Sequence, residues 1–277
     1  MNVAIEPEII FEDREILVLD KPAGMIVNRS DTTKGEYTLQ DWVEKYLKIQ
    51  STKSEIRNKS KIQNSPPKAD HPLAENDQNG FEFRNSDFEF SNRAGIVHRL
   101  DKETSGILLV AKNPQAFENL QKQFKERKVK KTYVALVHGK VEPSEGEINV
   151  PVGRLPWNRK RFGVLAGGRE AVTKYKVLSS KYYVSRGKRE ALTFIELYPQ
   201  TGRTHQIRVH LKYFGHPIFA DPLYAGRKTA RNDRKFLPRI FLHASRISFL
   251  HPKTHESVTF ESKLPEELER FLHAIDL

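Results

Sequence analysis

Nine residues at positions 98–106, His-Arg-Leu-Asp-Lys-Glu-Thr-Ser-Gly, place a single aspartate among basic and hydroxyl side chains. The apolar residues at 107–111 follow directly and predict a buried strand. A turn at the entrance to such a strand can hold a carboxylate ionised between basic neighbours, away from bulk water. Asp101 is therefore the candidate catalytic group. The alternative is that Asp101 only caps a turn, as an isolated aspartate in a loop commonly does.

The same nine residues resemble the signature of the RluA-type pseudouridine synthases, a family of RNA uridine isomerases. Four further segments fit the family in the same order: Asp-Lys-Pro-Ala-Gly at 20–24, Lys-Thr-Tyr at 131–133, the ten residues 201–210, and Leu-His-Ala at 242–244. Five ordered segments are far more specific than one short motif, because the odds of chance matches multiply. The resemblance implies that Asp101 is the essential catalytic residue and that the partner is ribosomal or transfer RNA.

The reaction implied by the resemblance breaks the bond between ribose and the glycosidic nitrogen of uridine, turns the uracil over and rejoins it through carbon 5. Nothing is added or lost, so we expect no cofactor. The base must be flipped out of its stack to be reached. A charged Asp101 could attack the anomeric carbon, attack the uracil ring, or remove a proton from the ribose carbon that bears the 2′-hydroxyl. The sequence leaves these three routes open.

Two further catalytic candidates come from the resemblance. Arg208 matches the family arginine that pairs with the aspartate, and such a partner is needed because burial alone disfavours a charged carboxylate. Tyr133 matches the active-site aromatic residue that stacks on the target base and takes part in moving the carbon 5 proton. Without the resemblance, Arg208 would be interpreted as a helix-surface arginine and Tyr133 as a core residue of a strand.

The charge of the chain favours a polyanionic partner. It carries 47 Lys and Arg against 35 Asp and Glu, a formal net charge of +12. Residues 121–190 hold 18 of these basic residues and six Glu, a difference of 12, so the remainder is neutral. This concentration favours a phosphate-tracking surface over scattered solvated lysines. The predicted RNA contacts are Lys21, Arg99, Lys131, Arg159, Lys160, Arg161, Arg203 and His205, with the basic cluster at 125–128 beside them.

Composition excludes several other classes. The chain has no cysteine, which rules out disulfides, thiolate catalysis and Cys-ligated zinc, and agrees with the cytoplasm as the expected compartment. No apolar run approaches 18 residues and the N-terminus lacks a signal-peptide pattern, so we expect no membrane span. The histidines lack a His-Glu-x-x-His pattern, so we predict no metal. A monomer is the default oligomeric state.

The spacing of apolar residues predicts an α+β fold with a mixed, largely antiparallel sheet and a few flanking helices. Expected strands lie at 9–11, 16–19, 107–111, 132–137, 171–178, 191–198, 246–250 and 258–260, and expected helices begin at 38, 114, 204 and 265. The resemblance adds a catalytic cleft across the middle of the sheet.

We expect a single catalytic domain over residues 1–277. A polar, mobile insertion is expected at about 50–92, with a short hairpin formed by Phe-Glu-Phe at 81–83 and at 88–90. No N-terminal RNA-binding module is expected, because the first strand begins near Ile9. The main rival function is a catalytically inactive RNA-binding or ribosome-assembly factor of the same fold. A nuclease or deaminase would need paired carboxylates or zinc ligands, and neither set is visible.

Overall fold

The computed structural model describes residues 6–30, 33, 35–47, 85–158, 161–185 and 187–275. Its described part is built on a mixed 9-stranded sheet in the order β1-β2-β3-β10-β4-β9-β8-β5, with β11 paired to β10. Strands β3 and β10 run parallel, and the other pairs are antiparallel. The predicted α+β class with a largely antiparallel sheet is confirmed.

The strands of the main sheet are β1 (Glu8–Glu12), β2 (Ile16–Lys21), β3 (Ser105–Ala111), β4 (Lys130–His138), β5 (Glu145–Asn149), β8 (Val172–Ser185), β9 (Lys188–Pro199), β10 (Leu242–Leu250) and β11 (Ser257–Glu261). A separate two-stranded sheet joins β6 (Val152–Arg154) to β7 (Phe162–Val164). The helices are α1 (Leu39–Leu47), α3 (Asn85–Arg93), α4 (Pro114–Lys125), α5 (Gln206–Tyr213), α6 (Arg227–Asp233) and α7 (Glu266–Ala274).

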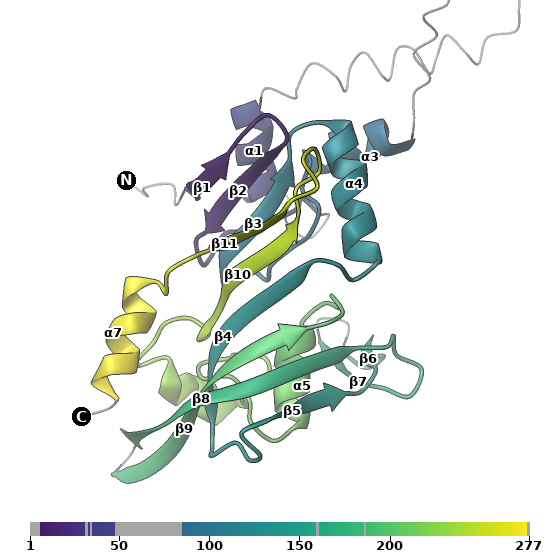
Figure 1. Ribbon diagram of the computed structural model, residues 1–277. Coiled ribbons are helices and arrows are strands. Elements are labelled where there is room, and N and C mark those ends of the chain that lie inside the picture. Colours follow the sequence, from purple (N-terminus) through teal and green to yellow (C-terminus); the bar gives the residue numbers. More distant parts are fainter. Residues whose placement is uncertain are drawn as a thin grey trace, which may run out of the picture.

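Both faces of the β2–β3 region are covered by helices, which explains why the sequences of these strands are continuously apolar. Ile16 and Val18 of β2 pack with Phe117 of α4 on one face. Leu17 and Leu19, which point the other way, pack with α1 on the opposite face. A sheet buried on both sides needs apolar residues at every position rather than at alternate ones. Figure 1 shows α1 and α4 on either side of this half of the sheet.

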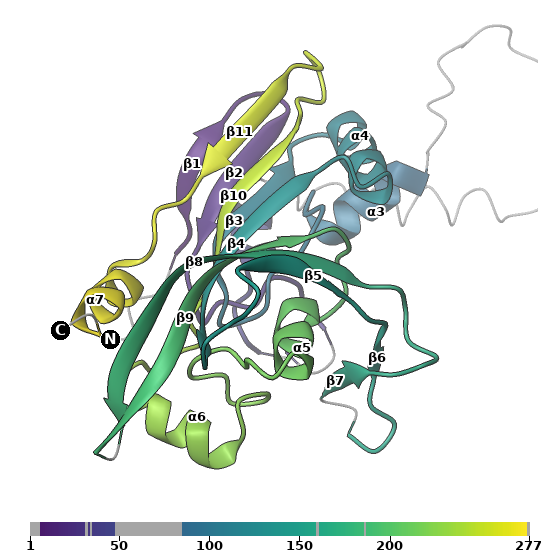
Figure 2. The same cartoon turned by 60° about the horizontal axis from the view of Figure 1, so that its bottom comes forward.

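Strand β4 connects this half of the sheet to a second half made of β9, β8 and β5 (Figure 1). Ala135 and Val137 pack against Ile207 and Leu211 of α5. Leu136, on the other face, packs in a cluster with α7. Figure 2 shows α5 and α6 beneath the second half, with α5 next to the small β6–β7 hairpin. Helix α5 is thereby brought beside the loop that precedes β3, where its Arg208 contacts Asp101.

Gly106 allows the two halves to join closely. It has a φ of 110°, in the region that favours glycine, and a Cβ at this position would lie 2.2 Å from the carbonyl oxygen of Ala244 in β10. The parallel pairing of β3 with β10 covers only Ser105 and Gly106. These residues follow directly on the segment that carries Asp101, so the same close approach fixes the end of that loop.

Most predicted elements are confirmed, with one correction. Asn113 caps α4 through its side chain and Pro114 occupies the first turn, as the sequence indicates. The hairpin predicted from the two Phe-Glu-Phe triplets is wrong at the second triplet, because residues 85–93 form helix α3. Phe90 of this helix is buried against Phe117 of α4, so the insertion ends before residue 92. Residues 48–84, which hold the first triplet, lie outside the described residues.

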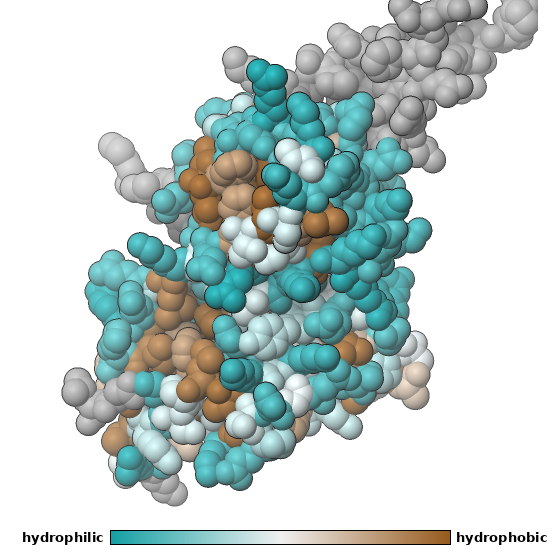
Figure 3. All heavy atoms as spheres, viewed as in Figure 1, coloured by the Kyte–Doolittle hydropathy of each residue, from teal (hydrophilic) through white to brown (hydrophobic). Residues whose placement is uncertain are grey.

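The face shown in Figure 3 is mostly hydrophilic, with one apolar area over the upper part of the sheet and another beside α7. Near α7, a groove of about 640 Å³ is lined by apolar residues that include Tyr182, Val184 and Phe236. Across the described ranges, no helix is long and apolar enough to cross a membrane.

The close approach at Gly106 predicts a large effect of the smallest substitution. Gly106→Ala should destabilise the fold by about 3 kcal/mol or more, because the new methyl group meets the backbone of β10 and the φ is unfavourable for alanine. Gly167→Ala, where no atom lies within 4 Å of the added Cβ, is the matched control and should change stability little. Urea unfolding of both variants measures the difference, and equal midpoints would contradict this account.

Candidate active site

A cleft of about 840 Å³ lies between the end of β9, the N-terminal half of α5 and the loop before β3. Eight of its lining residues are basic and one is acidic. The basic residues are Arg29, Arg93, Arg99, Lys125, Arg127, Lys131, Arg203 and Arg208, and the acidic residue is Asp101. The catalytic cleft expected across the middle of the sheet is therefore present, and its charge is suited to a phosphate backbone.

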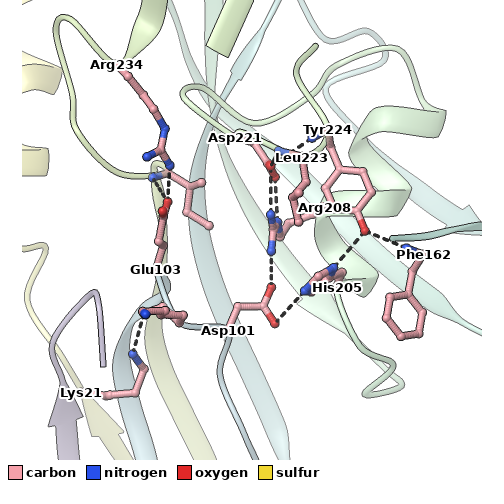
Figure 4. A network of polar contacts seen from close by, with 12 residues as sticks. Lys21, Asp101, Glu103, Phe162, His205, Arg208, Asp221, Leu223, Tyr224 and Arg234 are labelled. Carbon is pink, nitrogen blue, oxygen red and sulfur yellow. Dashed lines mark hydrogen bonds and ion pairs between the residues drawn. The ribbon is translucent and has the colours of Figure 1, made fainter. Parts of the chain in front are cut away.

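The arginine that faces Asp101 is held from behind by a second, fully buried aspartate (Figure 4). Nε and Nη2 of Arg208 donate to the two carboxylate oxygens of Asp221 at 2.7 and 2.9 Å. Nη1 of Arg208 donates to Oδ2 of Asp101 at 2.9 Å. The side chain of Asp221 is 0% exposed and that of Asp101 is 17% exposed. One guanidinium thus joins a buried structural carboxylate to a carboxylate at the cleft wall.

The charge of Arg208 is secure in this arrangement. Burial opposes the charged guanidinium, but the hydrogen bonds and negative charge of Asp221, together with Asp101, raise the pKa of Arg208 above its usual range. Asp221 also accepts the backbone N–H groups of Leu223 and Tyr224, at 2.9 and 3.1 Å. The Arg208 side chain lies over the ring of Tyr224, with its Cζ 5.0 Å from the ring centroid.

Gln206 builds the loop that leads into α5. Its side-chain carbonyl accepts from the Thr201 hydroxyl at 2.7 Å and from the Arg203 N–H at 3.0 Å. Its amide group donates to the carbonyl of Val172 and to the hydroxyl of Thr173, each at 3.0 Å. The buried amide therefore ties residues 201–203 to β8. This local anchoring fixes where α5 begins, and with it the direction of Arg208 two residues later.

His205 faces the second oxygen of Asp101. It precedes α5 in the left-handed conformation, with φ 56°, and its Nε2 lies 3.9 Å from Oδ1 of Asp101. Its Nδ1 lies 2.9 Å from the hydroxyl of Tyr224, and that hydroxyl accepts the N–H of Phe162. When the hydroxyl donates its hydrogen to Nδ1, a neutral imidazole carries its own hydrogen on Nε2, toward Asp101. Burial lowers the pKa of His205, so the ring is neutral near pH 7.

The buried Lys21 and the partly buried His98 hold the loop that carries Asp101. The ammonium group of Lys21 donates to the carbonyls of Pro22, Met25 and Lys102, at 2.8, 2.9 and 3.2 Å. Nε2 of His98 accepts the N–H of Leu109 at 2.9 Å, in place of a neighbouring strand. The loop is therefore fastened to β2 on one side and to β3 on the other.

The prediction that Lys21 contacts RNA is wrong. Its side chain is 0% exposed, and its ammonium group is occupied by the three carbonyls. Burial lowers the pKa of Lys21 to about 7, and the charge of Arg239 acts in the same direction. Lys21 positions the Asp101 loop from behind and does not reach the cleft.

Tyr133 and Lys131 project from β4 into the cleft. The Tyr133 ring packs against the apolar clusters of both halves of the sheet. Burial, and after it the charge of Asp101, raise the pKa of Tyr133 well above its usual range, so its phenol stays protonated. The ammonium of Lys131 lies 5.9 Å from the centroid of the Phe124 ring, and burial lowers its pKa to about 8.

The other predicted RNA contacts are distributed around the cleft. Arg99 is exposed and lines it together with Asp101. Arg203 also lines it, and its Nε donates to the carbonyl of Glu170 at 2.9 Å. Arg161 lies beside the site, with its guanidinium 5.9 Å from the centroid of the Tyr224 ring. Arg159 and Lys160 lie outside the described residues.

Comparison with known proteins identifies the family. A family model described as RNA pseudouridylate synthase matches residues 15–213. The chain belongs to this family. The uncharacterized RNA pseudouridine synthase YlyB of Bacillus subtilis (strain 168) is 34% identical over 278 residues, which cover 98% of this chain and 75% of the relative. The ribosomal large subunit pseudouridine synthase D of Nitrosomonas europaea is also 34% identical, over 98% of this chain and 66% of its own length.

The fold agrees with this assignment. The structure of human RNA pseudouridylate synthase domain containing 1 superposes with a TM-score of 0.61 at 26% identity, over 94% of this chain and 84% of that chain. The RluA-type resemblance is confirmed by the family model and the relatives. The pseudouridine synthases are isomerases that act on uridines in RNA, and this chain is one of them.

Three residues of this synthase site could not be identified from the sequence. Asp221 stands in an Asp-Pro dipeptide that indicates only a turn. Gln206 lies inside a family segment, but nothing in its type reveals that it satisfies four polar groups. Tyr224 is an isolated aromatic residue in a loop. In the described part of this synthase, no group of three or more His, Asp or Glu side chains is placed to hold a metal ion.

His98 predicts a specific acid sensitivity of this synthase. Burial, followed by the positive charge of Lys131, lowers the pKa of His98 to about 3 from an unfolded value near 6.5. Between pH 6.5 and 3, His98 is therefore protonated in the unfolded chain and neutral in the folded chain. The free energy of unfolding decreases as the pH is lowered through this window. Going from pH 7.5 to 5.5 should cost the wild type about 1 kcal/mol more than the His98→Gln variant.

Urea unfolding at the two pH values measures this difference. Glutamine can accept the Leu109 N–H but does not titrate, which isolates the proton effect from the loss of the hydrogen bond. The control His273→Gln changes an exposed histidine of α7 and should keep the wild-type pH dependence. An unchanged pH dependence in His98→Gln would contradict the assignment of His98 as a buried neutral acceptor.

Proposed function

We propose that this chain isomerises specific uridines of ribosomal or transfer RNA to pseudouridine, with Asp101 as the catalytic carboxylate. The observation that carries the proposal is the connected set Asp101, Arg208 and Asp221 at the wall of a basic cleft. Arg208 compensates the charge of Asp101 and fixes its position, because two of its three nitrogen groups are already held by Asp221. A carboxylate fixed in this way is prepared to act on a flipped nucleotide.

Tyr133 is suited to receive the flipped base. Its ring lines the cleft on the side of β4, and an aromatic face binds a base by stacking. The carbon 5 proton must leave and the freed ring nitrogen must gain one, so the isomerisation needs a proton carrier. Ionisation of Tyr133 is opposed by burial and by the charge of Asp101. The phenol therefore starts protonated, and it can donate this proton to the freed ring nitrogen and take up the carbon 5 proton in exchange.

The basic rim of the cleft provides the grip on the backbone of the RNA. Arg99, Lys125, Arg127 and Arg203 are at the cleft wall, and phosphate contacts supply most of the affinity of such proteins. The rival, a factor that binds RNA without catalysis, would not need Asp101 within this basic cleft, where it repels phosphates. Since one relative carries the name ribosomal large subunit pseudouridine synthase D, ribosomal RNA is the first substrate to test.

Asp101→Asn should abolish isomerisation and leave RNA affinity within about tenfold of the wild type, because the phosphate contacts remain. Pseudouridine is mapped in total RNA from cells with and without the gene, and the uridine found there is then tested with purified protein. Glu36→Gln is the control. It neutralises an exposed carboxylate that pairs with Lys102, the residue after Asp101. Turnover by Asp101→Asn would rule out the assigned role.

Lys125→Gln tests the grip of the cleft on the backbone. Loss of one phosphate contact should weaken binding equally for all RNA sequences and lower the slope of log affinity against log salt by about one. Lys253→Gln, which removes an exposed lysine from the turn between β10 and β11, should leave the slope unchanged. Binding isotherms of one RNA at four salt concentrations provide the slopes. Equal slopes for the two variants would remove Lys125 from the RNA path.

A further inference from the structure

Trp157 is the most exposed of the large apolar residues in the described part of the chain. Its relative exposure is 76%, whereas Trp42, the other tryptophan, is 9% exposed in the core. Tryptophan side chains usually bury most of their large surface. Trp157 lies in the connection between β6 and β7, a hairpin that is separate from the main sheet. Neither the catalytic set nor the cleft lining uses this side chain.

The hairpin that carries Trp157 is fixed to the active site. The N–H of Phe162 donates to the hydroxyl of Tyr224 at 3.1 Å, and the Phe162 ring meets His205 edge-on at 5.5 Å between centroids. Figure 4 shows Phe162 beside the His205–Tyr224 pair. On the Trp157 side of this connection, Leu155 N–H donates to the Arg161 carbonyl at 3.0 Å, and the Leu155 carbonyl accepts the Asn158 N–H at 3.2 Å. Trp157 therefore extends from a support that contacts the residue facing Asp101.

The surroundings of Trp157 are basic. The described residues at 151–158 and 161–169 include Arg154, Arg161 and Arg169 and no acidic residue. The guanidinium of Arg154 lies 5.0 Å from the centroid of the Phe162 ring. An exposed aromatic ring on a hairpin that also carries arginines is the combination with which proteins bind unpaired nucleotides, since the ring stacks on a base and the cations meet the phosphates.

We propose that Trp157 is a stacking platform for a second, unpaired base of the substrate RNA, outside the cleft that receives the target uridine. The proposal rests on the proposed function, which supplies the RNA, and it adds a subsite that selects RNA by local structure. A base in a loop or bulge can stack on Trp157, whereas a base inside a duplex is already stacked on its neighbours. The platform thus favours uridines that have an unpaired neighbour.

Tryptophan fluorescence tests the platform without any need for turnover. In a Trp42→Phe background, Trp157 is the remaining tryptophan. Adding a hairpin RNA with a uridine-rich loop should quench its emission, and a blunt duplex of the same length should not. The same quenching is expected in Asp101→Asn, so this result is independent of whether the catalytic role is correct. RNA binding with unchanged emission would overturn the platform.

Affinity measurements on substitutions at Trp157 complete the test. Trp157→Ala should weaken binding of the hairpin RNA about tenfold, the lower part of the range for loss of one stacked base. Trp157→Tyr should recover most of the affinity, and binding of the duplex should not change. Where turnover is measurable, the alanine variant should raise KM and keep the wild-type rate at saturating RNA. A dimer of the wild type that Trp157→Ala converts to monomer, with unaltered RNA affinity, would assign the side chain to a protein interface and overturn the proposal.

Discussion

The bidentate ion pair between Arg208 and Asp221 is the interaction on which the rest of the site depends. Neither charge could remain in this position alone, because an unpaired buried charge costs several kcal/mol. Together they orient the guanidinium so that its remaining nitrogen faces Asp101, which lies 107 residues away in sequence. Asp101 comes from the half of the sheet that holds β3, and Arg208 comes from the helix that covers the other half. The salt bridge between them joins the two halves of the sheet at the wall of the cleft.

The family segments divide their residues between chemistry and support. Within the segment around Asp101, His98 accepts a backbone N–H and Gly106 admits the neighbouring strand. Lys21, from the first segment, holds the back of the same loop. In the segment before α5, Gln206 satisfies four polar groups while Arg208 faces the cleft. A motif of this kind specifies a rigid support as much as a set of reactive groups.

A feature could be predicted from the sequence when it depends on residues that are close together in the chain. The strands and helices with clear periodicity were predictable, because their pattern is local. Helix α3 was not, since burial of Phe90 depends on α4, which follows it in the chain. The pairing of Asp101 with Arg208 required the family resemblance. The role of Asp221 depends on a fold that brings a turn beside α5, and the burial of Lys21 depends on carbonyls from two loops, so neither could be inferred from residue type.

The pairing of Arg208 with Asp221 also limits which substitutions homologues of this protein can accept. Asp101 is partly exposed at the wall and makes one hydrogen bond to Arg208, so a homologue could replace it and keep a folded domain. Arg208 and Asp221 cannot be replaced in this way, because the loss of either leaves the other as an unpaired charge in the interior. Among distant homologues, those that have lost the residue at position 101 should therefore still keep this pair, so the pair is the more durable mark of common descent.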